Sequence, residues 1–261
     1  MKNHTMRVTA IQLRVRNRSK EATLEHVLQL LDQARGSDLI LLPEIWPVGY
    51  FSFSRYVSES ESCNGRTVRL LRAKARALKA AIFSGSFVER RGSRFYNTSL
   101  LINPRGLIEA RYRKIHLFGF KSDERRILTP GRRISVTSQT WGMTGLATCY
   151  DLRFPEFFRK MVDRKAEFFL ITSAWPQARQ EAWTLFNRAR AHENLAYVFA
   201  CNCAGTDNGR TYAGRSVFVN PRGEVIAEAG DGEELLTAEV DPGAVRAIRR
   251  EFTALTDRVF I

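Results

Sequence analysis

Apolar and polar positions along the chain follow two patterns in turn. Between residues 21 and 34, leucine and valine fall at helical spacing, which predicts a helix that Gly36 ends. Residues 39–42 read Leu-Ile-Leu-Leu without a polar break, which predicts a strand covered on both faces. Similar patterns alternate up to residue 202. The predicted strands are 7–15, 38–43, 81–88, 96–102, 145–148, 167–172 and 196–202, and the predicted helices are 21–34, 67–80, 155–165 and 181–194.

Strands that alternate with helices are typical of an α/β protein built in layers. No Gly/Ser-rich linker or change in composition divides the chain, so we predict one domain over residues 1–261. Two segments echo each other: residues 99–106 and 216–223 are each an apolar strand followed by the turn sequence Asn-Pro-Arg-Gly. The echo indicates either two similar halves stacked sheet on sheet or two unrelated hairpins that share their turn chemistry.

Composition is that of a soluble globular protein. Of the 261 residues 44% are hydrophobic, and 17 Phe, 7 Tyr and 4 Trp supply apolar surface for a large core. No run approaches the roughly 18 apolar residues of a membrane span. Residues 1–20 are charged throughout and lack the apolar stretch of a signal peptide. We therefore expect a cytoplasmic protein with no membrane partner.

The net charge is strongly positive, because 41 Lys and Arg outnumber 27 Asp and Glu by 14. Such a charge could serve nucleic-acid binding, in which case affinity would fall steeply with salt. The basic residues are nevertheless spread along the whole chain, and no RNA-binding signature of interleaved aromatic and basic residues occurs. A solvated basic surface is the simpler interpretation, and we expect no nucleic-acid partner.

The four cysteines, Cys63, Cys149, Cys201 and Cys203, are expected to be reduced, because a chain of this size needs no disulfides. Cys201 and Cys203 have close spacing, but no second ligand pair follows at the distance of a zinc finger. The histidines form neither H-x-x-x-H nor H-E-x-x-H. We expect no metal and no cofactor; a thiol redox or zinc protein is the alternative that this pair would support.

Three segments place chemically capable side chains at or near the ends of predicted strands. Glu44 directly follows a buried strand, and its apolar neighbours would raise its pKa toward that of a general base. Lys114 alternates with apolar residues, so it and His116 could point the same way, with Lys114 as an electrophile. Cys149 lies between an apolar strand and a helix, where N–H groups could lower its pKa and bind an oxyanion. Taken singly, the first two could be surface residues and Cys149 a buried structural thiol.

Together these segments resemble the nitrilase superfamily of carbon–nitrogen hydrolases, which uses a Glu–Lys–Cys triad. The matching motifs are P-E at Glu44, Y-R-K-x-H-L-F at Lys114 and C-Y-D-x-R-F-P-E at Cys149, in the order of the family. The resemblance extends to Val240, and an A-W-P loop and an A-R-A-x-E-N run are most similar to the omega-amidase branch, which deamidates short α-keto acid amides. It implies a single-domain, four-layer α-β-β-α sandwich.

The resemblance implies acyl transfer through the thiol of Cys149. Glu44 would act as the base, while Lys114 and the backbone N–H of Tyr150 would stabilise the oxyanion. Ammonia would leave, and water activated by Glu44 would hydrolyse the thioester. The family has a second glutamate after the lysine, a place that Glu124 fills. It would either hold Lys114 or share in proton transfer, and the sequence leaves both open.

Substrate contacts follow from the chemistry of a small amide that carries a carboxylate. Such a substrate needs a cation near the thiol, and Arg153 is the candidate, with an ion pair at the start of the next helix as the alternative. Tyr50, Phe118, Tyr150 and Trp175 would wall the pocket, although the rings could equally pack in the core. Alternative activities within the superfamily are those of an N-carbamoyl amidase, a nitrilase and an amidase acting on a deaminated peptide.

The resemblance also implies a homodimer or larger homo-oligomer, because the family pairs sandwiches through helices beside the active site. Aromatic residues at positions 154–158 and in the helix that holds Trp183 and Phe186 could mark such an interface, or could fill the monomer's own core. A charge of +14 on each copy opposes association, so a dimer would need a sizeable buried patch.

Overall fold

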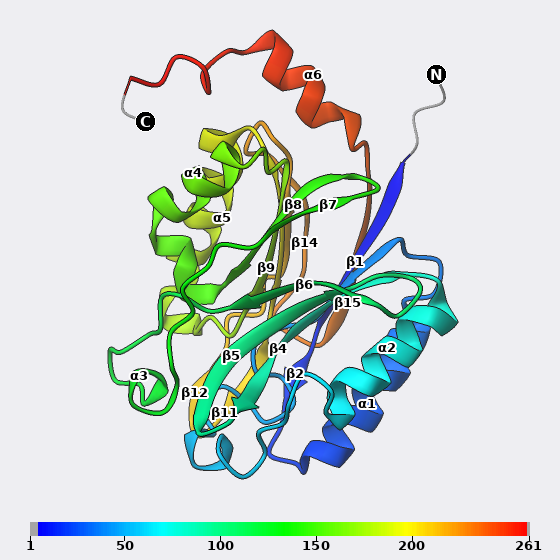
Figure 1. Cartoon of the computed structure of the whole chain (residues 1–261), viewed down its shortest axis with the longest axis vertical. Coiled ribbons are helices and arrows are strands. Elements are labelled where there is room, and N and C mark those ends of the chain that lie inside the picture. The colour runs from blue at the N-terminus through cyan, green and yellow to red at the C-terminus, as the bar shows by residue number, and fades with distance from the viewer. Residues whose placement is uncertain (1–4, 260–261) are drawn as a thin grey trace.

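Two six-stranded sheets form the centre of the computed structural model, which describes residues 5–259 (Figure 1). The first has the order β15 (Glu234–Val240), β1 (Met6–Gln12), β3 (Leu39–Leu41), β4 (Ala81–Arg91), β5 (Arg94–Ile102), β6 (Ile108–Arg113). The second has the order β14 (Val225–Glu228), β13 (Val217–Val219), β10 (Tyr197–Asn202), β9 (Phe168–Ser173), β8 (Gly142–Thr148), β7 (Val136–Gln139). A small sheet joins β12 (Arg210–Thr211), β11 (Ala204–Asp207) and β2 (Arg14–Val15).

Helices cover the outer faces of both sheets, two on each (Figure 1). The first sheet carries α1 (Lys20–Gln33) and α2 (Arg66–Leu78), and the second carries α4 (Pro155–Asp163) and α5 (Gln180–Asn194). The remaining helices are α3 (Glu124–Ile127), α6 (Gly243–Glu251) and the 3₁₀ turns η1 (Phe53–Arg55), η2 (Cys149–Arg153) and η3 (Gln177–Arg179). The predicted four-layer α-β-β-α sandwich is confirmed. Across residues 5–259 no helix combines the length and apolarity needed to cross a membrane.

The apolar run that predicted a doubly covered strand supplies two layers of the core. Leu39 and Leu41 face the second sheet and pack among residues such as Phe199, whereas Ile40 faces the helices and packs with Val27 of α1. This is the two-residue period of a strand, here apolar on both faces. The strand is therefore fixed in register, and its carboxyl end lies at a defined place between the layers.

Most predicted elements are confirmed within a few residues, but the predicted strand 7–15 is divided. β1 ends at Gln12, and β2 pairs with β11 in the small sheet. The Gln12 side chain is the reason: its amide donates to the carbonyl oxygens of Gly230 and Gly232 and accepts from Ser216 N. A buried polar side chain that satisfies these loops ends the apolar pattern of the strand.

The echo between the two Asn-Pro-Arg-Gly segments reflects two similar halves. Each sheet ends in an antiparallel hairpin, β5–β6 in the first and β13–β14 in the second, and the strand orders match along both sheets. In each turn the asparagine Oδ1, of Asn103 or Asn220, accepts two backbone N–H groups. The parallel strands β3 and β9 hold corresponding places, and their carboxyl ends meet at the candidate site.

Candidate active site

The turn after β3 carries Glu44 and is held from both sheets. Glu44 N donates to the carbonyl oxygen of Ser173 at the end of β9 (3.1 Å), and Ser86 N donates to the carbonyl oxygen of Pro43 (3.1 Å). Gly85 makes the second contact possible, because a Cβ there would overlap the Pro43 oxygen and its φ is +63°. The irregularity in β4 thus fixes where Glu44 projects.

Behind the thiol, Lys114 lies between two carboxylates, and all three side chains are fully buried. Lys114 Nζ is 2.8 Å from Glu44 Oε1 and 3.0 Å from both oxygens of Glu124. Asn97 Nδ2 donates to both carboxylates, at 2.8 and 3.0 Å, and Ala174 N donates to Glu44 Oε2 at 2.9 Å. The group formed by Glu44, Lys114 and Glu124 is called the buried triad of charges below.

Glu124 accepts hydrogen bonds from four donors. A carboxylate held in this way is poorly suited to act as a general base, whose contacts change as it gains and loses a proton. Besides Lys114 and Asn97, it accepts from the Tyr50 hydroxyl at 3.1 Å and from Phe118 N at 2.7 Å, both on Oε2. These contacts tie the lysine to the loops that wall the cavity. The geometry therefore favours the first of the two roles that the sequence left open, holding Lys114 in place.

Cys149 lies on a strained elbow at the end of β8, with φ of +47° and 9% exposure. Asp151 holds this elbow: its Oδ2 accepts from Thr148 N (2.9 Å) and from the Tyr112 hydroxyl (2.6 Å). Thr148 and Asp151 form a capping box around the first turn of η2. Sequence reasoning considered Asp151 only as a possible ion-pair partner of Arg153, with Glu156 as the other, although a threonine followed three residues later by an acid is the signal of such a cap.

Burial is the largest single cause of the pKa shifts in the site, and neighbouring charges are the next largest. Burial raises the pKa of Glu44, against the opposing effect of Lys114, and the predicted direction is confirmed. Burial would lower the pKa of Lys114, but the carboxylates of Glu124 and Glu44 outweigh it and the pKa rises, so the lysine stays charged. Burial also raises the pKa of Cys149, helped by Glu44. The predicted lowering of that pKa is wrong, because desolvation exceeds the help from nearby donors, and the thiol needs a base.

His116 does not point the same way as Lys114, and that prediction is wrong. Strand β6 ends at Arg113, so the alternation of a strand does not continue through the segment. His116 Nδ1 instead lies 2.7 Å from Asp151 Oδ1, and its ring stacks on Phe154 with centroids 3.8 Å apart. His116 supports the elbow from behind.

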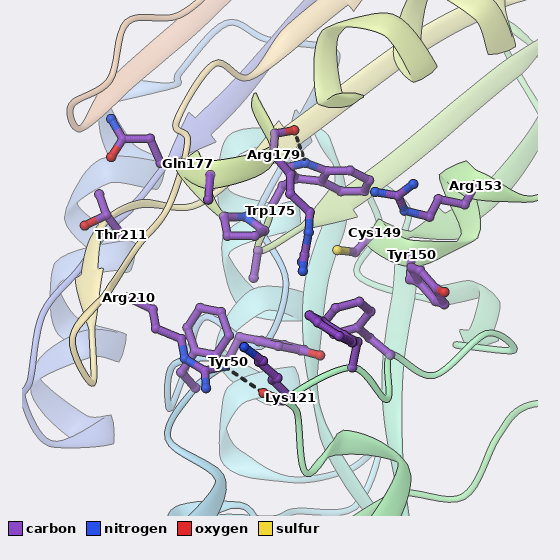
Figure 2. A pocket seen from close by; sticks show the side chains of 16 residues that line it. Tyr50, Lys121, Cys149, Tyr150, Arg153, Trp175, Gln177, Arg179, Arg210 and Thr211 are labelled. Atoms are coloured by element: carbon purple, nitrogen blue, oxygen red, sulfur yellow. Dashed lines mark hydrogen bonds between the residues drawn. The ribbon is translucent and has the colours of Figure 1, made fainter. Parts of the chain in front are cut away.

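A cavity of about 390 Å³ opens above Cys149 (Figure 2). It is lined by all five side chains that the sequence proposed as substrate contacts: Tyr50, Phe118, Tyr150, Arg153 and Trp175. The guanidinium of Arg153 lies 5.5 Å from the Trp175 ring centroid. In the described part of the chain it pairs with neither Asp151 nor Glu156, so the ion-pair alternative is not formed.

Three further cations line the same cavity, and sequence reasoning missed them. They are Lys121 in the turn before α3, Arg179 at the end of η3 and Arg210 in β12. None of the cavity-lining residues is a carboxylate, and within residues 5–259 none of the three forms a salt bridge. In a chain with this many basic residues, the sequence offers no signal that separates these three from the rest of the surface. The cavity is thus suited to an anionic ligand.

The aromatic residues that could have marked an interface mostly fill the monomer's core. Phe157, Phe158 and Trp183 are 4%, 0% and 0% exposed and pack between α4, α5 and the second sheet. Leu185 of α5, by contrast, is 63% exposed. The aromatic pattern therefore gives no support to an interface.

The remaining cysteines have no access to the cavity. Cys201 and Cys203 are fully buried, and their thiols donate to the carbonyl oxygens of Ile11 (3.2 Å) and Glu44 (3.7 Å). Cys63 is half-buried, and all four thiols are free. Over the described range, no three His, Cys, Asp or Glu side chains come together as metal ligands would.

Comparison with known proteins identifies what this arrangement is similar to. The carbon-nitrogen hydrolase family model matches residues 7–250. The 2-oxoglutaramate amidase of Paenarthrobacter nicotinovorans is 34% identical over 96% of this chain and 88% of its own length. Nit3 of Saccharomyces cerevisiae, a member of branch 10 of the nitrilase superfamily, superposes with a TM-score of 0.90 at 29% identity, over 98% of this chain and 97% of its own. A variant of the Nesterenkonia sp. AN1 amidase (25% identity, TM-score 0.84, 97% and 94% covered) shows covalent addition of an acetamide moiety at its active site cysteine.

Proposed function

This chain belongs to the carbon-nitrogen hydrolase family, as an amidase that acts on C–N bonds other than peptide bonds, and from that premise we propose its substrate and the roles of its residues. The substrate is a short amide that carries a carboxylate, most directly an ω-amide of an α-keto dicarboxylic acid. The observation that carries this proposal is the cavity itself, whose lining holds four cations and no carboxylate.

Acylation begins when Cys149 attacks the amide carbon and its proton moves to Glu44. The raised pKa of the thiol makes a base necessary, and the raised pKa of Glu44 brings that base closer to neutral pH. Lys114 and the N–H of Tyr150 stabilise the oxyanion, and Lys114 does so without reorganisation because Glu124 already holds it. Glu44 then returns the proton to the nitrogen, and ammonia leaves.

Deacylation uses the same residues in reverse. Water gives a proton to Glu44 and attacks the thioester, and collapse of the tetrahedral intermediate expels the thiolate, which takes that proton back. Two moderate barriers replace the single high barrier of amide hydrolysis. Glu44 has two donors besides the lysine, Asn97 Nδ2 and Ala174 N, which hold it in place when Lys114 turns to the oxyanion.

Arg153 binds the substrate carboxylate in this proposal, with Arg179 as a second half-buried cation of the cavity. Both guanidinium groups lie against aromatic rings, Arg153 near Trp175 and Arg179 near Phe118 (5.2 Å). Stacking of this kind holds a guanidinium in place while it keeps its hydrogen bonds for a ligand. The relatives named 2-oxoglutaramate amidase and omega-amidase support a substrate of this charge.

An ammonia-release screen tests the proposal. We expect turnover of ω-amides that carry a carboxylate, weaker turnover of neutral amides of the same length, and none of either by Cys149→Ala. A preference for N-carbamoyl amines or nitriles over all ω-amides would contradict the proposed substrate class. Arg153→Gln should raise KM for the charged amide more than for the neutral one, and equal effects on both would remove Arg153 from carboxylate binding.

We also propose that the protein acts in the cytoplasm as a homodimer. A free catalytic thiol and three further free cysteines suit a reducing compartment. The exposed Leu185 on α5 adds to the family resemblance in favour of pairing. Sedimentation at micromolar protein and near-physiological salt tests the dimer; a fully active species at the monomer mass of 29.8 kDa would contradict it.

A further inference from the structure

Asn97 of β5 is a buried polar residue that contacts both carboxylates of the buried triad of charges. The residue is 1% exposed, and its Nδ2 donates to Oε1 of Glu44 at 2.8 Å and to Oε1 of Glu124 at 3.0 Å. Its Oδ1 has no hydrogen-bond partner within residues 5–259. A buried carbonyl oxygen without a donor costs stability, so the need to fill the core does not explain an amide at this position. The two contacts of the amide nitrogen do.

The carboxylates fix which end of the amide faces them. With the amide turned round, Oδ1 would face two carboxylate oxygens, and none of the three could donate. The main chain holds the residue as well: the carbonyl oxygen of Asn97 accepts from Lys114 N at 2.9 Å, and Asn97 lies opposite Val88 of β4. One residue of β5 therefore contacts Lys114 through its main chain and both glutamates through its side chain.

Two neutral donors define the plane of the Glu44 carboxylate. Asn97 Nδ2 binds Oε1, and Ala174 N, which follows β9 of the other sheet, binds Oε2 at 2.9 Å. Lys114 also binds Oε1, but during turnover its ammonium is shared with the oxyanion. The two glutamates then repel each other more strongly, because less positive charge lies between them. Asn97 carries no charge for the oxyanion to attract and lies outside the cavity lining, so its contacts persist.

We propose that Asn97 is a positioning residue, which keeps Glu44 ionised and aligned while Lys114 stabilises the oxyanion. The inference rests on the proposed function, because it takes Glu44 as the base. A hydrogen bond to the ionised form of a carboxylate favours that form. Burial and the charge of Glu124 already raise the pKa of Glu44. Loss of the Asn97 donor should raise this pKa further and leave less of the base ionised at neutral pH.

Asn97→Leu tests the role, because leucine has a similar size and no donor. The readout is the pH profile of kcat/KM for an ω-amide, measured by ammonia release from pH 4 to pH 10. We expect the acid limb to move to higher pH by about one unit, the scale of a lost hydrogen bond to a charged group. On that limb kcat/KM should fall by about tenfold, with little change in KM. The loss should shrink at higher pH, where Glu44 is ionised in both enzymes. Asn97→Ser, which is smaller and keeps one hydroxyl donor, should move the limb less in the same direction.

Asn194→Leu is the matched control. Asn194 is also fully buried, and its Nδ2 donates to the carbonyl oxygen of Arg190 (2.9 Å) and to the carboxylate of Glu193 (3.3 Å). Its Oδ1 likewise has no partner in the described part of the chain. Asn194 ends α5, outside the cavity lining. This variant should lower Tm and leave the acid limb in place.

An equal move of the acid limb in Asn194→Leu would assign the effect to lost stability and overturn the role of Asn97. A folded Asn97 variant with an unmoved limb, or with a loss of kcat/KM that is equal at every pH, would overturn it too. Failure of both Asn97 variants to fold, judged by circular dichroism, would make the residue structural and count against the inference. In each of these cases, normal turnover of ω-amides by the wild type leaves the proposed function intact. Absence of ω-amide turnover by the wild type refutes both.

Discussion

Replacing Glu124 by glutamine separates the positioning of Lys114 from the chemistry of the thiol. Glu124 accepts from Asn97 and Lys114 on Oε1, and from Lys114, Tyr50 and Phe118 on Oε2. Glutamine keeps one oxygen and turns the other position into a donor. With the amide nitrogen in place of Oε2, the Tyr50 hydroxyl and Phe118 N lose this acceptor. With the nitrogen in place of Oε1, it faces two donors, Asn97 and Lys114, which keep Glu44 as an acceptor.

The size of the effect follows from these contacts. Each buried donor left without an acceptor costs about 1–3 kcal/mol, so Glu124→Gln should lower the free energy of unfolding by about 2–5 kcal/mol. For a chain of this size that corresponds to a fall in Tm of about 5–15 °C. Misplacement of Lys114 should also lower kcat by about 10²-fold, the scale of a lost oxyanion donor, with a smaller change in KM.

The pH dependence of kcat/KM gives the diagnostic readout. The charge of Glu124 raises the pKa of both Glu44 and Lys114, so its removal lowers both. A base with a lower pKa stays ionised to more acidic pH, so the acid limb of the profile, which reports the free enzyme's base, should move to lower pH. Steady-state ammonia release from pH 4 to pH 10, together with thermal unfolding by circular dichroism, measures both effects.

Glu89→Gln is the control for buried carboxylates, because Glu89 is also buried and accepts from Thr98 and Arg113, outside the cavity lining. It should lower Tm while kcat and the acid limb change little. An unchanged acid limb in Glu124→Gln, or a kcat within threefold of the wild type, would refute the positioning role. An acid limb that moves to higher pH would refute the assigned coupling to Glu44.

Four further results are expected. Cys149→Ala should abolish ammonia release while the circular dichroism spectrum and Tm stay near those of the wild type; residual turnover above the uncatalysed rate would contradict it. Glu44→Gln and Lys114→Ala should each lower kcat by about 10² or more, and the double variant should lose far less than the product of the two losses. Gly85→Ala should lower stability by about 2–4 kcal/mol, measured by urea unfolding, because its Cβ overlaps the turn that carries Glu44. Dialysis against EDTA should leave the rate intact, whereas a loss that zinc restores would favour metal chemistry.

Local sequence pattern predicted most of the helices and strands up to residue 202, whereas the residues of the site followed from three motifs that together resemble a family. The run at 39–42 predicted a doubly covered strand, and an acid directly after such a strand indicated a site at its carboxyl end. That Glu44 meets Ser173 and Ala174 from the other sheet was not predictable from either segment alone. It depends on how the two halves pack against each other, which only the shared motif order suggested.

The sequence analysis missed features that depend on how deeply a side chain is buried and on which distant segments meet at the cavity. Asn97 looks like a polar interruption in a strand, yet it bridges the two carboxylates of the buried triad of charges. The pKa of Cys149 was expected to fall, because donors near an elbow are visible in the sequence and the depth of the thiol is not. Arg179 in η3 and Arg210 in β12 reach the same cavity because two segments distant in the sequence converge on it.

The central claim is that Cys149 carries the acyl group during turnover. Acid-quenched enzyme, mixed with an ω-amide in the steady state and digested, is analysed by mass spectrometry for the peptide that contains this residue. We expect the acyl group of the substrate on Cys149, in greater amount when Glu44→Gln slows deacylation more than acylation, and on no other cysteine. Rapid turnover by Cys149→Ala, or an acyl group found only on Cys63, Cys201 or Cys203, would contradict the account.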